Sequence, residues 1–387
     1  SQISRTYVTL EGVSIEENAA PSGAAVQLGS ASSVFYTVGG DLKMIPSAAC
    51  GANDDCNRVV DNEAQTIGGV PTTGGILVAG DAARIDLQGT RISGNVGGPP
   101  VYSDDPFSED PFAVKLYQVV IADNVVDGEA LVRVVRGLST SIVDSTFAGN
   151  ALTGAHIVRT AGTTTLDGSI LWQPGKTTLL STASIIGRVL ASETASLAGA
   201  EQLIGADPRF IDRANGNYRL CAASQAIDVA PAVIGDDRDA DGLPRDQDLA
   251  SVSNGVGVRD LGAYERQGLL PLVLNGGFDS DVRLWPEGVA GASAHQTEDY
   301  AGISTSGSLR VTETGGSIRV LRARRQCVEL PFASTYRLNG YGRGYSAALF
   351  RDTLSIEWRL RGNSANCSGP VLREGVLALP NGTTWGT

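Results

Sequence analysis

Lysine, histidine and methionine are scarce in this chain of 387 residues, which holds three lysines, two histidines and one methionine. The two histidines, His156 and His295, stand alone in the sequence, and no recognisable motif places one beside a Ser or Cys nucleophile. A net charge of −12 disfavours nucleic acid as a partner, because nucleic acid requires a basic surface. We therefore expect neither a histidine-based metal centre nor a nucleic-acid partner.

Long apolar runs are also missing. No stretch approaches the roughly 18 consecutive apolar residues of a membrane-spanning helix, so we expect no transmembrane segment in this chain. The chain begins at Ser1 without Met and without a basic segment followed by an apolar one, which predicts that a signal peptide has been removed. Its 48 glycines, with abundant Ser, Thr and Val, favour short strands joined by many turns.

Five cysteines are present, and their positions predict two disulfides. Cys50 and Cys56 bracket a short polar loop, a spacing that suits a small disulfide ring. Cys327 and Cys367 both fall in the last part of the chain and could cross-link two strands there. Cys221 is left over and is expected to be a buried thiol. Two disulfides would indicate an oxidising, extracytoplasmic compartment.

A degenerate repeat is the clearest positive signal. Alternating small and β-branched residues, then Ile, Leu or Phe, then a polar turn closed by Asn recur about every 24 to 30 residues. One unit cannot bury its apolar face alone, whereas stacked units form a continuous core. Asn suits the bends because it tolerates left-handed backbone angles and can form hydrogen bonds between coils. The copies run over residues 7–18, 84–95, 116–124, 140–150 and 164–172.

This period, without a helical segment between the strands, predicts an all-β fold that begins with a right-handed parallel β-helix over residues 1–204. The Leu-x-x-Leu-x-Leu pattern of leucine-rich repeats is absent. Two segments interrupt the repeat, residues 40–75 and 97–112. In a solenoid such insertions leave the coils as lateral loops, often over a binding face.

The character of the sequence changes over residues 205–268, where four short motifs follow one another: Asp207–Phe210, Asn217–Leu220, Ser224–Asp228 and Asp260–Glu265. This segment resembles the closing module of bacterial choice-of-anchor Q domain proteins. The resemblance implies an exported parallel β-helix that is often displayed on the cell surface, and it implies little about activity. We expect this module to cap the open end of the solenoid, which would otherwise expose unpaired strand edges.

Residues 269–387 read as a third domain. The opening Leu274–Asp279, with Trp285 shortly after it, resembles the start of a carbohydrate-binding module of the galactose-binding-like kind. That resemblance implies a small jelly-roll β-sandwich, which would be short or incomplete at Thr387. Sugar rings stack on aromatic side chains. The aromatic candidates for glycan binding are Trp285, Tyr300, Tyr341, Tyr345 and Trp358, although Trp285 and Trp358 would serve equally as core residues.

An acidic loop near the end of the second module matches part of a calcium-binding pattern. Asp237, Asp239 and Asp241 occupy alternate positions, Gly242 follows, and Asp248 stands at the twelfth position. A hard divalent cation needs six to eight oxygen ligands, which this spacing could begin to supply. A proline inside the loop and the missing bidentate Glu leave a solvated acidic turn as the alternative. Calcium is therefore the one cofactor that the sequence suggests.

The lateral insertion carries a second acidic group, Asp104, Asp105, Glu109 and Asp110, with aromatic residues between them. Paired carboxylates beside aromatic rings are the equipment of a glycoside hydrolase, in which one group acts as the acid and the other as the base or nucleophile. The same carboxylates could bind calcium beside a uronic acid. Alternatively, these acidic residues have no functional role and belong to a hydrated loop with turns that begin at proline.

Enzymatic activity has little other support. Some parallel β-helices are polysaccharide lyases, which abstract a proton with Lys, Arg, Tyr or His beside a neutralised carboxylate. The supply of lysine and histidine is poor here, although Arg133 and Arg136 could point outward from a coil. The motifs of polygalacturonase-type enzymes are absent. These features lean against an enzyme.

The function that follows is that of a secreted or surface-displayed bacterial β-helix, structural or adhesive, that contacts glycans or other surface components. One alternative is a polysaccharide lyase or glycoside hydrolase that acts on an acidic polysaccharide. Another is a subunit that assembles with copies of itself into a filament or surface layer. Residues 269–387 hold 12 Arg against 10 acidic residues, a charge of +2, so the preceding residues carry −14 and the two parts could attract each other.

Overall fold

The computed structural model divides into two compact units, one of residues 1–210 and 218–270 and the other of residues 211–217 and 271–387. The described residues of the first part are 6–20, 23–28, 40–47, 57–64, 75–80, 83–104, 114–136, 139–221, 223–232, 238–249 and 256–267. Those that follow are 278, 285, 293–296, 298, 308–311, 324–328, 342–344, 355–361, 369–378 and 382–386.

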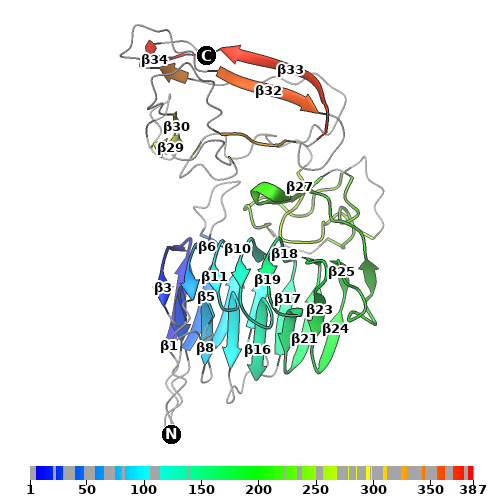
Figure 1. Ribbon diagram of the computed structural model, residues 1–387. Coiled ribbons are helices and arrows are strands. Elements are labelled where there is room, and N and C mark those ends of the chain that lie inside the picture. Colours follow the sequence, from blue (N-terminus) through cyan, green and yellow to red (C-terminus); the bar gives the residue numbers. More distant parts are fainter. Residues whose placement is uncertain are drawn as a thin grey trace. The chain divides into compact units, whose positions relative to one another are not determined.

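Four parallel sheets run along the first unit, and neighbouring strands in each sheet come from successive coils of the chain (Figure 1). Sheet A contains, in spatial order, β1 (Thr6–Glu11), β5 (Gly40–Ile45), β9 (Arg84–Gln88), β13 (Val114–Tyr117), β17 (Ser139–Val143), β21 (Thr163–Asp167) and β24 (Ala183–Ile186). Sheet B contains β2 (Ser14–Glu16), β6 (Asn57–Val60), β10 (Thr90–Ser93), β14 (Val120–Ala122), β18 (Thr146–Ala148), β22 (Ser169–Trp172), β25 (Arg188–Ala191) and β26 (Gln202–Ile204).

The other two sheets complete each coil. Sheet C contains β3 (Ala19–Ala20), β7 (Glu63–Ala64), β11 (Val96–Gly97), β15 (Val125–Val126) and β19 (Ala151–Leu152). Sheet D contains β4 (Val26–Leu28), β8 (Leu77–Gly80), β12 (Val101–Asp104), β16 (Val132–Arg136), β20 (His156–Thr160) and β23 (Thr177–Leu180). The expected parallel β-helix is therefore confirmed.

Strict alternation explains why sheet A has one apolar face. In β9 the side chains of Ile85 and Leu87 are buried, whereas those of Arg84, Asp86 and Gln88 are partly exposed. The parallel register repeats this choice from coil to coil, so the buried positions form rows along the axis. The row that contains Leu87 runs through Met44, Leu116, Ile142, Leu166 and Ile186.

The coils bend at residues with left-handed backbone angles. At the corner between sheets A and B these include Gln118 with φ of 57° and Asp144 with φ of 48°. At the corner between sheets B and C, Asp123 has φ of 57° and is followed by Asn124. Non-glycine residues rarely adopt this conformation, so the two aspartates mark positions where the surrounding contacts hold a strained backbone.

A ladder of buried amides runs along the corner between sheets B and C. Asn124 donates from Nδ2 to Oδ1 of Asn150 at 2.8 Å, and its own Oδ1 accepts from Nδ2 of Asn95 at 2.8 Å. The same bond joins Asn62 to Asn95 at 3.0 Å and Asn18 to Asn62 at 2.9 Å. The expectation that stacked Asn side chains connect the coils is thus confirmed.

Sheet B differs from sheet A because several of its strands are buried on both faces. Val120, Ile121 and Ala122 of β14 are all buried, as are all three residues of β18. Ile121 belongs to the core inside the coils, whereas Val120 and Ala122 belong to a second apolar cluster. That cluster joins Ala148, Ile170 and Leu190 of sheet B to Tyr218, Leu220, Ile227, Leu261 and Tyr264 of the following module.

The module after the coils therefore lies against the outer face of sheet B, and the expectation that it also caps the end of the solenoid stays a prediction. Gly262 N–H donates to the carbonyl of Gly168 at 2.6 Å, and Ala263 N–H donates to Oγ1 of Thr146 at 2.9 Å. At the last coil, Leu197 is buried in the core, and Glu201 N–H donates to the carbonyl of Ile186 at 3.2 Å. The segment after the last coil thus contributes Leu197 to the core inside the coils.

After the coils, the chain forms β27 (Phe210–Asp212), the short 3₁₀ helix η1 (Arg213–Asn215) and β28 (Asn217–Leu220). The described strands of the second unit pair in antiparallel fashion: β29 (Ser293–Gln296) with β30 (Ser308–Val311), β31 (Gly342–Gly344) with β34 (Gly382–Gly386), and β32 (Ser355–Arg361) with β33 (Val371–Ala378). The predicted all-β fold class, a parallel β-helix followed by antiparallel strands, is confirmed. Among the described residues no helix has the length and apolar character needed to cross a membrane.

Candidate functional site

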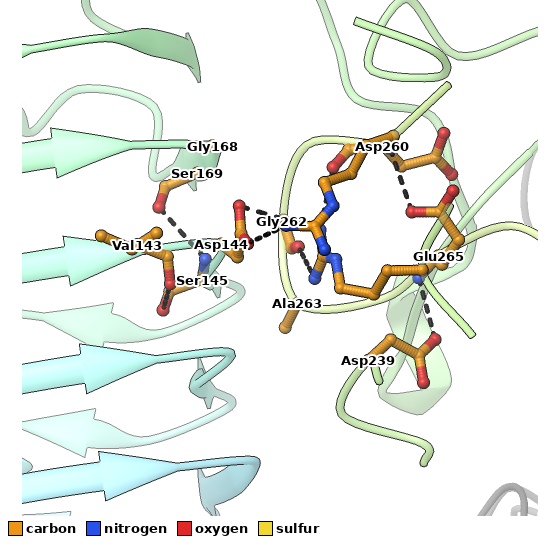
Figure 2. Close-up of polar contacts among 12 residues, drawn as sticks. Val143, Asp144, Ser145, Gly168, Ser169, Asp239, Asp260, Gly262, Ala263 and Glu265 are labelled. Atoms are coloured by element: carbon orange, nitrogen blue, oxygen red, sulfur yellow. Dashed lines mark hydrogen bonds and ion pairs between the residues drawn. The ribbon is translucent and has the colours of Figure 1, made fainter. Parts of the chain in front are cut away.

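Two outer faces of the β-helix carry concentrated charge. The first is the outer face of sheet B, which the module after the coils (called the lateral module from here on) covers. Asp144 is buried at its strained corner, and its Oδ2 accepts from Nη1 of Arg259 at 3.2 Å. Nη2 of Arg245 lies 3.8 Å from Oδ1 of the same carboxylate. Figure 2 shows Asp144 pointing from the coils toward the loop that carries Asp260 and Glu265. Asp144 therefore anchors the module to the solenoid.

Arg245 occupies the centre of this contact with a side chain that is 0% exposed. Its Nη1 donates to the carbonyl of Gly262 and its Nη2 to the carbonyl of Asp260, both at 2.9 Å. The planar fork of a guanidinium suits two acceptors that lie side by side. Arg245 thus fixes the loop that touches sheet B.

Three buried carboxylates lie on or beside this loop: Asp260 and Glu265 belong to it, and Asp239 lies next to it (Figure 2). Asp239 accepts from the N–H groups of Asp241, Leu243 and Glu265 at 2.8 to 2.9 Å. Glu265 in turn accepts from the N–H of Asp260 at 3.0 Å. Burial raises the pKa of Asp260 to about 7, that of Asp239 to about 8 and that of Glu265 to about 10, although the backbone donors oppose the shift.

These shifts predict that the folded unit loses stability as the pH rises. In the unfolded chain the three carboxyl groups ionise near pH 4, whereas in the folded protein they keep their protons to between about pH 7 and pH 10. Between these limits the folded state binds more protons, so their contribution to stability is complete below about pH 4 and falls as the pH rises. We expect a lower thermal midpoint at pH 9 than at pH 5. Glu265→Gln should make the dependence shallower, and a midpoint that rises from pH 5 to pH 9 would contradict the assignment.

The opposite corner of sheet B supplies a second anchor. The hydroxyl of Tyr218 donates to Oδ1 of Asp123, and Nη2 of Arg91 lies 3.8 Å from Oδ2. Burial raises the pKa of Asp123, and the Tyr218 hydrogen bond and Arg91 oppose that shift. A Cβ atom at Gly149 would come within 2.0 Å of the Tyr218 hydroxyl, so the close approach requires glycine. The two strained aspartates thus hold the module at both borders of sheet B.

The residues of the predicted calcium loop contact protein groups in this arrangement. Asp239 accepts the backbone hydrogen bonds described above, and Asp241 pairs with Arg219, whose Nε donates to Oδ2 at 2.6 Å. The Arg219 guanidinium also lies 4.6 Å from the ring centroid of Tyr264. Asp248 is exposed, and Asp237 lies outside the described residues. Within the described residues no group of three or more His, Cys, Asp or Glu side chains could hold a metal ion.

Among the predicted lateral carboxylates, Asp104 is the one that the structure describes. It ends β12, and its Oδ1 accepts from Nε of Arg136 at 2.7 Å. Asp105, Glu109 and Asp110 lie outside the described residues. The Asp104–Arg136 pair places these two side chains, which the sequence had suggested separately, beside each other on the outer side of sheet D.

The second charged face is the outer face of sheet D, where one row of side chains crosses three strands. The register pairs Tyr102 of β12 with Arg133 of β16, and Arg133 with Arg159 of β20. Oε2 of Glu129 forms ion pairs with both arginines, at 3.2 Å from Nε of Arg133 and 2.5 Å from Nη1 of Arg159. The Arg133 guanidinium lies 5.7 Å from the ring centroid of Tyr102. Burial, then the nearby Asp104, raise the pKa of Tyr102.

Sequence reasoning named Arg133 as a possible outward side chain but missed Arg159 and Glu129 as its neighbours. The signal was present in the spacing, since Arg133 and Arg159 stand 26 positions apart in a chain whose coils repeat at about that interval. Recognition required the register, because a shift by one residue turns a side chain from the outer face to the core.

The remaining sequence candidates lie in the second unit. The Trp285 ring packs against Phe278, with ring centroids 5.4 Å apart, and its backbone carbonyl accepts from Nη1 of Arg324 at 2.8 Å. Tyr300, Tyr341 and Tyr345 lie outside the described residues.

The cysteines are described in part. Cys221 keeps its thiol and is half-buried. Cys50, Cys56 and Cys367 lie outside the described residues, so the two proposed pairs stay predictions.

No protein-family model matches the chain, and no curated protein or solved structure matches it either. The resemblances to choice-of-anchor Q proteins and to carbohydrate-binding modules therefore stay expectations.

Proposed function

We propose that this protein is an exported or surface-displayed β-helix that binds acidic glycans on the outer face of sheet D. The observation that carries the proposal is the pair of partly exposed arginines, Arg133 and Arg159, side by side on two neighbouring strands. Guanidinium groups recognise carboxylates through paired N–H donors, and uronic acids carry one carboxylate on each sugar. The Tyr102 ring, which is only 9% exposed, lies beside the Arg133 guanidinium and is not itself open to a ligand.

The charges of this face leave a local positive excess. Glu129 is shared between Arg133 and Arg159, and Asp104 is matched by Arg136, so the five side chains carry a net charge of +1. Arg133 uses Nε for Glu129 and Arg159 uses Nη1, so each guanidinium retains further N–H groups for a ligand. A positive excess on a chain of net charge −12 favours an anionic ligand at this place.

The spacing suits a polymer with repeated carboxylates. Neighbouring strands lie about 4.8 Å apart, so the backbone positions of Arg133 and Arg159 are about 4.8 Å apart across sheet D. The strands hold these positions rigidly, which reduces the ordering cost of binding. Arg159 is 42% exposed and Arg133 26% exposed, so both can meet a ligand from solvent.

Two features of the sequence support the proposed location. Disulfides persist mainly in oxidising compartments, and the positions of Cys50 with Cys56 and of Cys327 with Cys367 predict two of them. The composition, with few lysines and a strongly acidic first unit, suits a hydrated exported protein.

The test is binding of polygalacturonate and alginate oligomers to the whole chain, measured by calorimetry at low and high salt. We expect Arg133→Ala with Arg159→Ala to weaken binding by at least about tenfold, which is about 1.4 kcal/mol. Arg84→Ala is the matched control, because Arg84 is half-buried and lies near Asp41 on sheet A. Failure of every uronate oligomer to bind, or an equal loss in the control, would refute the proposal. Release of unsaturated or reducing ends from the oligomers would favour the lyase or hydrolase alternative.

A further inference from the structure

The first coil of the β-helix has open sheet edges. β1, β2, β3 and β4 each stand at one end of their sheet, so within the described residues no strand lies on the side that faces away from the next coil. The edge of sheet A is the longest of the four, because β1 has six residues. An open edge is a row of unpaired N–H and C=O groups, which favours pairing with another strand.

The apolar interior of the coils is open at the same end. Val8 and Leu10 of β1 point toward the core but are only partly buried. Their partners one coil later, Leu42 and Met44, are 1% and 0% exposed. The first coil therefore needs a further apolar layer to bury its inward side chains fully. Other inward residues of this coil are also partly buried: Ile15, Val26 and Leu28.

The backbone of β1 turns a defined set of groups outward. Gly12 N–H donates to the carbonyl of Ile45 at 3.3 Å, and Ile45 lies opposite Glu11 in the register. In a parallel pair, consecutive residues turn their N–H and C=O groups to opposite sides of the strand. The groups of Tyr7, Thr9 and Glu11 therefore point away from β5, toward the open edge.

β1 carries none of the features that usually protect an edge strand from pairing. It contains no proline, no lysine and no inward-pointing charge, and its one charged residue, Glu11, is exposed on the outer face. Four of its six residues are β-branched or aromatic, which favours an extended strand. The edge is thus suited to pairing.

We propose that two copies of this chain pair edge to edge through β1, antiparallel, about a two-fold axis at Thr9. Residues directly opposite each other in an antiparallel pair point to the same face. With Thr9 opposite Thr9 of the second copy, Val8 lies opposite Leu10, so both face the core. On the outer face, Tyr7 lies opposite Glu11, and the two Glu11 side chains stay apart.

This register also uses every outward backbone group of β1. Tyr7 with Glu11, Thr9 with Thr9 and Glu11 with Tyr7 are hydrogen-bonded pairs that exchange two bonds each, or about six in total. A shift by two residues keeps the faces matched but leaves about four of these bonds. The strand is therefore complementary to itself in one preferred register.

A second copy fits the whole end of the solenoid, because the same apolar end face supplies both partners. The first coil spans residues 6–28, about as many residues as the roughly 20 to 30 on each side of a standard interface. Two-fold pairing is complete with two copies. A head-to-tail filament, in contrast, would join β1 to β24 at the other end of sheet A and would not close.

The experiment is sedimentation of the full chain from about 1 to 100 μM, with hydrogen exchange at both limits. We expect a dimer in which the N–H groups of Tyr7, Thr9 and Glu11 exchange more slowly as the concentration rises. Thr9→Pro should raise the dimer dissociation constant at least about 30-fold, because it removes two hydrogen bonds at the axis. Its N–H faces away from β5, a position at which an edge strand tolerates proline.

Thr9→Lys is the second variant. It places like charges directly opposite each other, so it should weaken the dimer about tenfold or more at low salt and less at high salt. Ser184→Pro is the matched control at the opposite edge of sheet A. Ser184 is exposed, and its N–H also points away from the neighbouring strand, because Gly187 N–H donates to the carbonyl of Leu166. We expect this control to leave the dimer unchanged.

Three results would overturn the inference. A monomer at every concentration would do so, and slow exchange at Thr9 in that monomer would mean that another segment of the chain covers the edge. A dimer that both Thr9 variants leave intact would place the contact elsewhere. Species that grow beyond the dimer and that Ser184→Pro shortens would show head-to-tail assembly. Circular dichroism identifies any variant that fails to fold, and the remaining Thr9 variant then decides.

Discussion

Asn124→Ala is expected to lower the free energy of unfolding of the β-helix by about 4 kcal/mol. Asn124 sits in the middle of the amide ladder and is 1% exposed. Its Nδ2 donates to the carbonyls of Ile92 and Ala122, both at 3.0 Å, as well as to Asn150. Its Oδ1 accepts from both the backbone N–H and the Nδ2 of Asn95.

The size of this loss of stability follows from the buried hydrogen-bond donors that lose their acceptor. Alanine removes the acceptor of two donors on Asn95, and a buried donor without an acceptor costs about 1 to 3 kcal/mol. Water reaches this corner poorly, so it offers little compensation. Because stability in stacked repeats is carried between neighbours, the loss at one coil also weakens its contacts with the next.

Denaturant unfolding and hydrogen exchange measure this effect. The N–H of Asn95, which donates to Oδ1 of Asn124 at 3.0 Å, should exchange faster in the variant. Asn18→Ala is the matched control, since Asn18 ends the same ladder and is exposed, and it should cost only about 1 kcal/mol. Equal losses at Asn18 and Asn124 would show that the ladder does not depend on burial.

Much of the solenoid was predictable because its physics is local. Alternation in residues 84–88 assigns Ile85 and Leu87 to the core, and the Asn that ends each repeat marks a corner. A period of about one coil then aligns these features without knowledge of distant contacts. The ladder expected from Asn95, Asn124 and Asn150 follows from the same repetition.

The position of the lateral module could not be obtained in this way. Its contacts join residues more than a hundred positions apart, such as Asp144 with Arg259. One local signal was available: Val120, Ile121 and Ala122 are apolar without alternation, which indicates burial on both faces. Read with this rule, β14 and β18 predict that something covers sheet B, but the pattern does not name the segment.

The acidic loop shows why the partners of a charged side chain are hard to predict from the sequence. The spacing of Asp239 and Asp241 suits a cation, yet the structure supplies them with backbone N–H groups and with Arg219. Spacing along a loop fixes which oxygens are near one another, whereas the partners come from residues distant in the sequence. The same reason explains why Arg159 was missed beside Arg133.

Arg245→Met is expected to cost about 3 to 5 kcal/mol in the stability of the docked module, because it breaks a buried charged network on one side only. Methionine fills a similar volume but gives no hydrogen bond to the carbonyls of Gly262 and Asp260. Asp144 would also lose one of the two guanidiniums near its buried carboxylate. Arg245→Lys should lie between wild type and methionine, since it keeps the charge but not the planar fork.

Hydrogen exchange shows which part of the protein loses stability in the Arg245→Met variant. The N–H groups of Gly262 and Ala263, which donate to Gly168 and Thr146 of the coils, should exchange much faster in Arg245→Met, whereas those of sheet A should not. Arg136→Met is the matched control, because Arg136 forms an exposed pair with Asp104 and such pairs contribute at most about 1 kcal/mol. If hydrogen exchange became faster by the same factor in all coils, the module and the solenoid would unfold as one unit. Acceleration confined to the module would mean that the solenoid folds without it, and that the apolar outer face of sheet B depends on Arg245 to stay covered.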